Sequence, residues 1–448
     1  MRRLVLPLCR RPLCLLLAAV VVLLLEAASA ASPKKRSCGP GFFSASPPPP
    51  SPPAPPLVTM AEQKNNPVSI VPGVVGRFSG GDRGDAAAGV PPYPPPARGL
   101  SVVSYNIYQM SRYLFPNWAQ DLRVRRLLEI KFIRDHDVIV FQEAWDGQSR
   151  KILLDGLRDL GYAHQTPLTG NGPAGWDEFG GRYCRACPYS GGVVIVSKWE
   201  ITYKANRVFA DACGFDWFSN KGFAYARIKL PFANLHLIGT HMQSEDQGCS
   251  SRTPRAVRES QLREMSEWLA ARGIPEDEPV IFAGDFNVDR PLGEELGVDD
   301  GDGDLRRAER RQGTPAGPGP ADLEEYEKAL EILSACPARQ FDGTRYTWDP
   351  RTNSIARHIN PAGPREYLDH VLFRRGHENI PGMKLAMSLQ SALNVKTDPY
   401  EVGVLPVANE YDDISDHYPV VFTVCWEADD GERGKRRAAT LDSHPNVI

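Results

Sequence analysis

The chain has 448 residues, of which 52 are Lys or Arg and 55 are Asp or Glu, giving a formal net charge of −3. This near balance creates no basic field over the whole protein, so we expect no nucleic acid among its partners. The length allows two or three average domains, but the first hundred residues are not globular in composition.

The N-terminal segment has the pattern of an export signal. It begins with the basic stretch MRRLVLPLCRR, continues through the apolar run Leu15–Leu25 and ends in small residues at Ala30. The apolar run is shorter than the ~20 residues that span a bilayer, so we interpret residues 1–30 as a signal peptide rather than an uncleaved anchor. The sequence therefore predicts a secreted, extracellular protein.

A proline-rich segment follows the signal. Sixteen of the 40 prolines lie between Pro40 and Pro96, among few large apolar residues. Such a composition does not offset the chain entropy of folding, so residues 31–98 are predicted to be disordered. We place one folded domain at residues 99–427 and a charged, disordered tail at residues 428–448.

Within residues 99–427, short apolar runs alternate with amphipathic stretches. Eight runs predict buried strands, namely LSVVSYN, DVIVFQE, GGVVIVS, GFAYARI, LHLIGTH, PVIFAGDFN, YLDHVLF and YPVVFTV. Helical patterns occur at residues 122–133, 151–160, 256–271 and 323–333. This order predicts a mixed α/β (α+β) domain with sheets packed between helices. Residues 289–322 break the rhythm and predict a mobile insertion, whose Asp-Gly cluster lacks the spacing of a calcium loop.

Polar side chains stand at or near the ends of several predicted strands. They are Asn106, Glu143, His241, Asp285, Asn287 and Asp369. Each residue alone is explained more simply as a turn cap or a structural hydrogen-bonding group. Together, carboxylates, amides and imidazoles at strand ends are typical of a site for metal-assisted phosphoryl transfer.

The stretch YDDISDHYPV, from Tyr411 to Val420, sets Asp416 and His417 just before the last predicted strand. Adjacent residues of an extended strand point to opposite faces, so these two can serve one site only if the backbone turns there. We interpret Asp412 and Asp413 as a solvated turn.

The cysteines fit an oxidising compartment. Nine cysteines fall to seven once the signal peptide is removed, which allows at most three disulfides and leaves their pairing open. Cys184 and Cys187 form a single C-x-x-C pair. One pair is not a full zinc ligand set, so a local disulfide or two free thiols is favoured.

Two sets of motifs identify a family. YN at 105, QE at 142, GTH at 239, GDFN at 284, YLDH at 367 and SDHYPV at 415 are typical of the DNase I-like endonuclease/exonuclease/phosphatase superfamily. LFPNWAQ, GGVVIVSKW, CGFDWFSNKGFAYARI, HMQSEDQGC and TWDPRTNSIA form a narrower set. From about Leu100 to Val424 the chain thus resembles the secreted neutral sphingomyelinase C enzymes best known from bacteria.

This resemblance implies a four-layered sandwich of two packed β-sheets flanked by helices. It implies hydrolysis of sphingomyelin to ceramide and phosphocholine, with Mg2+ as the cofactor and Mn2+ or Co2+ as substitutes. We expect a monomer that touches sphingomyelin-containing membranes peripherally.

For the metal, the resemblance makes Glu143 the central ligand, with Asn106 beside it. It places Asp416 at the metal face or in support of the same catalytic network. Mg2+ prefers carboxylate and amide oxygens and keeps several waters, which fits this set better than a cage of Cys or His. The reaction needs such a cation because a phosphodiester anion repels hydroxide.

For catalysis, the resemblance makes His417 the general base, oriented by Asp369. It puts His241 near the leaving oxygen and assigns Asp285 and Asn287 to hold the attacking water and a phosphate oxygen. An imidazole with an ordinary pKa of about 6.5 is a good proton acceptor near neutral pH, and a neighbouring carboxylate fixes its tautomer.

The resemblance also implies a disulfide between Cys213 and Cys249 and a phosphate contact from Lys221. Trp217 and Phe218 are interpreted either as core residues or as groups that enter the lipid headgroup region. In lytic bacterial relatives an aromatic hairpin before the final Asp-His is thought to grip the membrane. The equivalent stretch here, LNVKTDPYEVGVLPVANE, has a single aromatic residue, which argues against strong insertion.

Three alternatives stay open. A phospholipase C acting on lysophosphatidylcholine or related choline lipids would share the headgroup chemistry. A nuclease of the same superfamily would need a groove of Lys and Arg for the backbone phosphates. A lipid-binding module without catalysis would be expected to lack at least one of Glu143, His241, Asp285 and His417, yet all four are present.

Overall fold

The computed structural model describes residues 98–116, 118–245, 248–249, 253–290, 320–402 and 409–428. The predicted signal peptide (1–30), residues 31–97 of the proline-rich segment, residues 291–319 of the insertion and residues 429–448 of the tail lie outside the described residues. Within the described ranges, no helix is long and apolar enough to cross a membrane.

All four predicted helices are present. The helical elements are α2 (Gln120–Glu129), η1 (Lys131–Arg134), α3 (Gly147–Asp159), η2 (Gly214–Phe218), α4 (Pro254–Ala270), α6 (Pro320–Ile332) and α7 (Ser354–Ile359). Polar caps explain where two of them begin. The Asp146 side chain accepts a hydrogen bond from the Ser149 N–H, and Thr253 accepts one from Ala256 with proline at the first helical position.

The strands form two seven-stranded sheets. The order of the first is β13 (Gln340–Gly343), β15 (Met383–Ala392), β18 (Val420–Ala428), β1 (Arg98–Asn106), β2 (Val138–Gln142), β6 (Val194–Ser197) and β3 (His164–Gln165). The order of the second is β12 (Ala335–Cys336), β14 (Asp369–Arg374), β11 (Val280–Asp285), β10 (Asn234–His241), β9 (Gly222–Lys229), β7 (Glu200–Val208) and β4 (Glu178–Gly181). Two small sheets pair β16 (Lys396–Val402) with β17 (Asn409–Asp413) and β5 (Tyr189–Ser190) with β8 (Ser219–Asn220).

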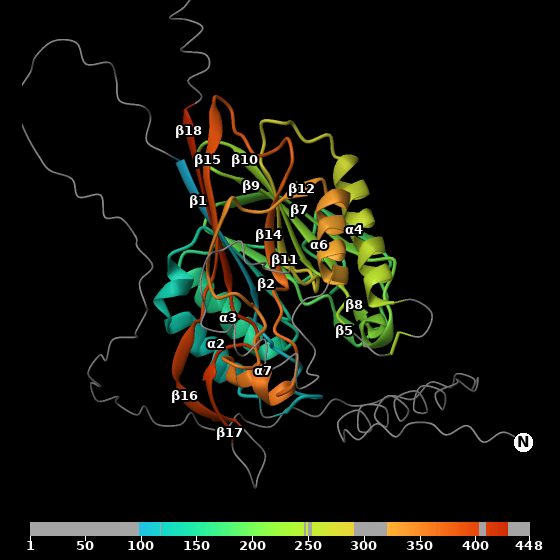
Figure 1. The fold of residues 1–448 in the computed structure, drawn as a ribbon, viewed down its shortest axis with the longest axis vertical. Coiled ribbons are helices and arrows are strands. Elements are labelled where there is room, and N and C mark those ends of the chain that lie inside the picture. The colour runs from blue at the N-terminus through green and yellow to red at the C-terminus, as the bar shows by residue number, and fades with distance from the viewer. Residues whose placement is uncertain are drawn as a thin grey trace, which may run out of the picture. The chain divides into compact units, whose positions relative to one another are not determined.

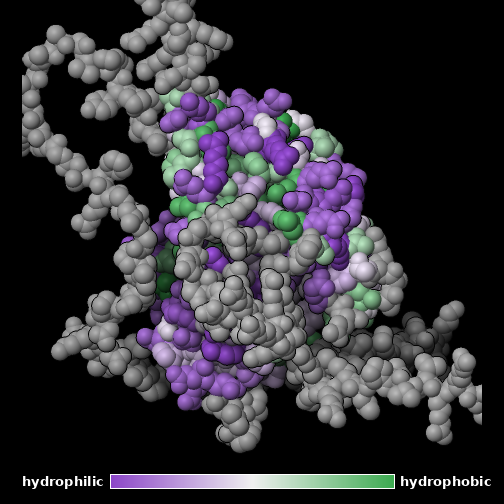
Figure 2. All heavy atoms as spheres, in the orientation of Figure 1, coloured by the Kyte–Doolittle hydropathy of each residue, from purple (hydrophilic) through white to green (hydrophobic). Residues whose placement is uncertain are grey.

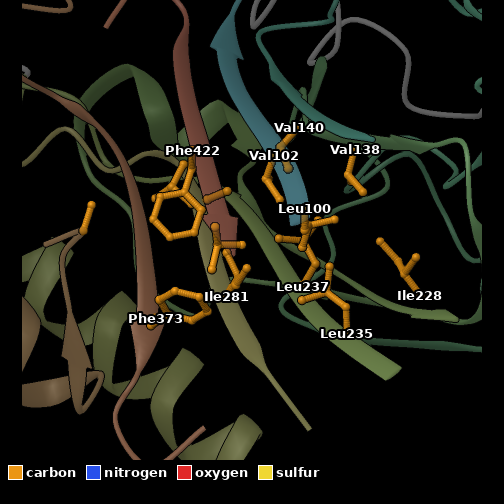
Figure 3. Packing of buried hydrophobic residues seen from close by; sticks show 14 of the residues in the cluster. Leu100, Val102, Val138, Val140, Ile228, Leu235, Leu237, Ile281, Phe373 and Phe422 are labelled. Atoms are coloured by element: carbon orange, nitrogen blue, oxygen red, sulfur yellow. The ribbon is translucent and has the colours of Figure 1, made fainter. Parts of the chain in front are cut away.

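The main core lies between the two large sheets. Leu100 and Val102 of β1 join Leu237 of β10 and Ile281 of β11 in one buried cluster (Figure 3). Gly239 permits this close approach, because a Cβ there would come within 2.7 Å of a Val140 methyl carbon. Burial of such side chains is the dominant favourable term in folding.

Helices cover the outer face of each sheet. On the first sheet, Val103 and Tyr105 alternate with the inward residues of β1 and pack with residues of α2 and α3. On the second sheet, Leu262, Met265 and Leu269 line one side of α4 and join a separate cluster. Figure 1 shows α2 and α3 apart from α4 and α6, and Figure 2 shows mostly hydrophilic residues over α4 and α6. The predicted four-layered sandwich is confirmed.

Strand pairing gathers the polar strand ends at one edge of the sandwich. β1 runs parallel to β2, and β10 runs parallel to β11. In the second sheet His241 stands opposite Asp285, and Asp285 stands opposite Asp369. Residues 44 and 84 positions apart in sequence therefore become direct neighbours.

The interpretation of Asp412 and Asp413 as a solvated turn is wrong. Both residues belong to strand β17, and Asp413 is only 1% exposed. Its carboxylate accepts hydrogen bonds from the Ser354 N–H at 2.6 Å and from Lys396 at 2.8 Å. Asp413 is buried because it ties the β16–β17 hairpin to the first turn of α7.

Candidate active site

The backbone itself presents two of the predicted site residues. Glu143, directly after β2, has φ 57°, and Asn287, two residues after β11, has φ 51°. Residues other than glycine rarely adopt this left-handed backbone conformation, and the exceptions cluster at functional sites. Each turns the chain sharply at the strand end.

Asn106 links the two sheets at the site. Its amide nitrogen donates to Glu143 Oε1 and to Asp285 Oδ2, both at 3.0 Å. Its oxygen accepts from the Tyr108 N–H at 3.1 Å. Asn106 therefore holds two carboxylates in place from the last position of β1.

Glu143 presents a carboxylate oxygen that could hold a cation. Its Oε2 is buried and has no hydrogen-bond partner within the described residues. Burial, together with the negative charge of Asp416, raises the pKa of Glu143 to about 8. A buried carboxylate beside another acidic group is costly unless a cation compensates, so the donor set fits a hard divalent ion.

Asp416 and His417 lie in a bend between β17 and β18. This is the backbone turn that the sequence argument required for both to serve one site. The Ser415 hydroxyl fixes the bend, because it donates to the Asn106 carbonyl at 2.6 Å and contacts Asp416 Oδ1 at 3.2 Å.

His417 is paired with Asp369. Nδ1 of His417 lies 2.8 Å from Asp369 Oδ2, and Nε2 lies 3.8 Å from Asp285 Oδ2. Burial lowers the pKa of His417, but Asp369 and Asp285 outweigh it and raise the pKa well above the ordinary value. One potential metal-ligating atom from each of Asp285, Asp369 and His417 also lies within 4.8 Å of the other two. The Nδ1 hydrogen bond to Asp369 leaves Nε2 as the nitrogen that can accept a proton.

His241 has the opposite electrostatic setting. Burial, the positive charge of Lys221 and His417 together lower the pKa of His241 well below its ordinary value. Lys221 Nζ lies 3.2 Å from His241 Nε2. Because a lysine ammonium only donates, Nε2 accepts and the neutral ring carries its proton on Nδ1.

Lys221 is itself held by three acceptors. Besides His241, its Nζ donates to Asp216 Oδ2 at 2.8 Å and to the Met242 carbonyl at 2.9 Å. Asn287 reaches the same carbonyl through its amide nitrogen at 3.1 Å, and its N–H donates to Asp285 Oδ1 at 2.9 Å. All eight predicted metal and catalytic residues, together with Lys221, thus belong to one connected network.

Sequence reasoning missed Asp216 and Ser415. Asp216 accepts from Lys221 and from Ser244, so it positions the lysine. Its place in CGFDWFSNK, five residues before Lys221, was the available signal. Ser415 lay inside the quoted SDHYPV motif, but its role depends on Asn106, which is 309 positions away.

Two disulfides flank this side of the domain. The predicted Cys213–Cys249 bridge is present, with a Cα–Cα distance of 5.0 Å, and Cys184 and Cys187 form a local disulfide rather than a metal site. Within the part of the chain that the structure describes, Cys336 and Cys425 are free thiols.

The aromatic residues of η2 are on the surface. Phe215, Trp217 and Phe218 are 53%, 46% and 38% exposed, so the core interpretation of Trp217 and Phe218 is excluded. The Arg182 guanidinium stacks on Trp217 at 3.6 Å from the ring centroid.

Comparison with known proteins agrees with this geometry. The Endonuclease/Exonuclease/phosphatase family matches residues 103–417. A sphingomyelinase C of Bacillus cereus is 35% identical over 326 residues, covering 72% of this chain and 88% of that protein. The chain belongs to the sphingomyelinase C family. A Staphylococcus aureus member of the family, a phospholipase C, is 35% identical over 322 residues, covering 72% of this chain and 86% of that protein.

Solved structures of the sphingomyelinase C family have the same fold. The enzyme of Streptomyces griseocarneus superposes with a TM-score of 0.62 at 35% identity, covering 74% of this chain and all of that chain. A Staphylococcus aureus beta toxin variant with bound magnesium ions superposes with a TM-score of 0.62 at 33% identity, covering 72% and 99% of the two chains.

Proposed function

We propose that this protein is a Mg2+-dependent phosphodiesterase of the phospholipase C type, which hydrolyses sphingomyelin to ceramide and phosphocholine. One observation carries the proposal. Glu143 has a buried, partnerless Oε2 and belongs to a network that includes the His417–Asp369 pair, in a chain 35% identical to a sphingomyelinase C. A cation site beside a general base is what hydrolysis of a phosphodiester requires.

Glu143 would hold the metal, with Asp416 and Asn106 at the same face. Support comes from the raised pKa of Glu143, which burial and the negative charge of Asp416 cause. The beta toxin relative binds magnesium. When bound, Mg2+ would neutralise phosphate charge and stabilise the charge that builds up in the transition state.

His417 would act as the general base. Its Nδ1–H donates to Asp369, so Nε2 can accept the proton of a water molecule held by Asp285, whose Oδ2 lies 3.8 Å away. The water oxygen forms a bond to phosphorus, its proton passes to Nε2, and the bond between phosphorus and the ceramide oxygen breaks. Asn287 would contact a phosphate oxygen.

Lys221 and His241 would provide positive charge and a donor near the leaving oxygen. All three hydrogen-bonding directions of the Lys221 ammonium are already used, by Asp216, His241 and Met242. Direct contact between Lys221 and phosphate therefore requires the exchange of one of these bonds.

The enzyme would act outside the cell as a monomer on membrane sphingomyelin. Secretion is supported by the signal peptide pattern of residues 1–30 and by two disulfides. Contact with the headgroup region would involve the exposed aromatics of η2, since Trp and Phe favour the membrane interface.

A substrate panel tests the assignment. The mature protein is incubated with vesicles of sphingomyelin, phosphatidylcholine or lysophosphatidylcholine, and with supercoiled plasmid, each with Mg2+ and with EDTA. We expect metal-dependent phosphocholine release that is fastest from sphingomyelin, with no nicking. Faster release from lysophosphatidylcholine would reassign the lipid, and nicking without lipid hydrolysis would move the protein to the nucleases.

A further inference from the structure

Two side chains beside the site take no part in the network described above. Trp348 forms an antiparallel bridge with His417 on one side and with Glu366 on the other. Trp348 and Glu366 exchange both backbone hydrogen bonds, at 3.0 Å from the Trp348 N–H and at 2.9 Å from the Glu366 N–H. The general base, an indole and a carboxylate thus lie side by side on three short segments of chain.

The three side chains share one face. Residues that stand directly opposite each other in an antiparallel pair project to the same side of the ladder. Glu366, Trp348 and His417 therefore project together, with the indole in the middle. The far edge of the indole rests against Gly363, where a Cβ would come within 2.8 Å of Cη2, so the ring is held in place.

Neither Glu366 nor Trp348 has a side-chain partner within the described ranges. Both are partly buried, yet no hydrogen bond or ion pair reaches the Glu366 carboxylate, and no ring or cation contacts the Trp348 indole. Burial, with the charge of Glu245 next, raises the pKa of Glu366 to about 7, while His417 lowers it. Glu366 thus has a positive neighbour in His417, but it makes no ion pair within the described residues.

The nearby cations of the protein are already committed. Arg365, adjacent to Glu366 in sequence, bonds both oxygens of Asp349 at 2.9 Å and stacks on Tyr346. Arg258, which neutralises Glu245, is also bonded to both oxygens of Glu325. A cationic group of a bound molecule could therefore pair with the Glu366 carboxylate, which makes no ion pair within the described residues.

An aromatic face next to a carboxylate is the chemistry that recognises quaternary ammonium groups. A trimethylammonium cannot donate a hydrogen bond, so it is bound by cation–π attraction and by charge rather than by amides or hydroxyls. In a phosphocholine headgroup only two carbons separate the ammonium from the phosphate oxygen. The ammonium site must therefore adjoin the general base, as Trp348 and Glu366 do.

We propose that Trp348 and Glu366 form the subsite for the quaternary ammonium of the substrate headgroup. The proposal rests on the proposed function and deepens it, because it names the residues that select a choline headgroup at the same site. The indole would cover one side of the ammonium, and the carboxylate would balance its charge.

The test compares two soluble diesters, p-nitrophenylphosphorylcholine and bis(p-nitrophenyl) phosphate, which differ in the presence of choline. We expect Glu366→Gln and Trp348→Leu each to reduce the ratio of kcat/KM for the choline substrate to that for the choline-free substrate by roughly tenfold, given ~1–2 kcal/mol for a partly desolvated cation–π contact. Trp348→Phe keeps an aromatic face and should preserve most of the ratio. Glu259→Gln, an exposed carboxylate paired with Arg263, is the matched control and should leave the ratio unchanged.

A second readout is competitive inhibition by phosphocholine and by inorganic phosphate. The wild type should bind phosphocholine more tightly than phosphate, and Glu366→Gln should narrow that gap. Equal losses on both diesters, or an unchanged ratio in a folded Glu366→Gln protein, would overturn the proposal. Failure of the proposed function looks different, because the wild type would then not hydrolyse p-nitrophenylphosphorylcholine, whether or not it hydrolyses bis(p-nitrophenyl) phosphate.

Discussion

Replacing Asp369 by Asn isolates the role of the base. Asp369 Oδ2 lies 2.8 Å from His417 Nδ1, and both side chains are buried, so the substitution removes the carboxylate and keeps its shape. A hydrogen bond to a charged group contributes ~1.5–3 kcal/mol, and an Asn can also hold the imidazole in the wrong tautomer.

The expected loss is that of a general base. Positioned acid–base groups contribute roughly 10²–10⁴-fold, so kcat should fall by about that factor while KM changes little. The pH profile should move as well. The base works unprotonated, and Asp369 raises the pKa of His417, so its removal should shift the acidic limb of kcat/KM to lower pH.

The assay is phosphocholine release from sphingomyelin in mixed micelles between pH 5 and 9, at saturating Mg2+. Asp412→Asn, a partly exposed carboxylate near the site, is the control and should behave like the wild type. A kcat within a few fold of the wild type, or a fall in kcat without any shift of the acidic limb, would refute the role given to Asp369.

Four further predictions concern metal, disulfide, pH and membrane. Glu143→Gln should abolish turnover and should also abolish the rise in Tm that Mg2+ gives the wild type. Without metal, the variant should melt at a higher temperature than the wild type, because the substitution removes a carboxyl group whose charge is costly to bury. Cys213→Ser should cost ~2–5 kcal/mol of unfolding free energy in urea titrations, and an unchanged midpoint would count against the bridge. Burial lowers the pKa of His136 to about 4 and that of His370 to about 3, from 6.5. The unfolded state then binds more protons at these histidines, so their contribution to stability should be full above pH 6.5 and fall on acidification toward pH 4, by on the order of 3 kcal/mol for His136. The same pH dependence of the urea midpoint in the wild type and in His136→Asn between pH 7 and 5 would disprove this. Trp217→Ala should lower the fraction of protein that sediments with vesicles several-fold and leave the hydrolysis of a soluble diester unchanged. Vesicle binding equal to that of the wild type would exclude a membrane role for η2.

Strands with two buried faces were the easiest part of the fold to predict. β2 and β11 are buried at every position, so they read as continuous apolar runs. β7 and β15 were missed because their sequences, EITYKANRV and MKLAMSLQSA, mix polar and apolar residues along partly exposed strands. The layer order followed from the family resemblance, since periodicity alone does not fix how sheets stack.

The site was predictable in composition and not in its contacts. Strand ends are visible in sequence, so Asn106 and Asp285 could be singled out. Their hydrogen bond joins positions 179 apart and depends on the packing of two sheets, which no local pattern encodes. The prediction for Asp413 was wrong for the same reason, because its burial depends on contact with α7, which lies more than fifty positions earlier in the sequence.

The most direct test of the central claim is phosphocholine release from sphingomyelin vesicles by the mature wild-type protein and by His417→Ala, in Mg2+ and then in EDTA. The account predicts release by the wild type in Mg2+, its loss in EDTA, its recovery when Mg2+ is restored, and none from His417→Ala in either condition. Release that persists in EDTA, or that His417→Ala supports at the wild-type rate, would contradict it.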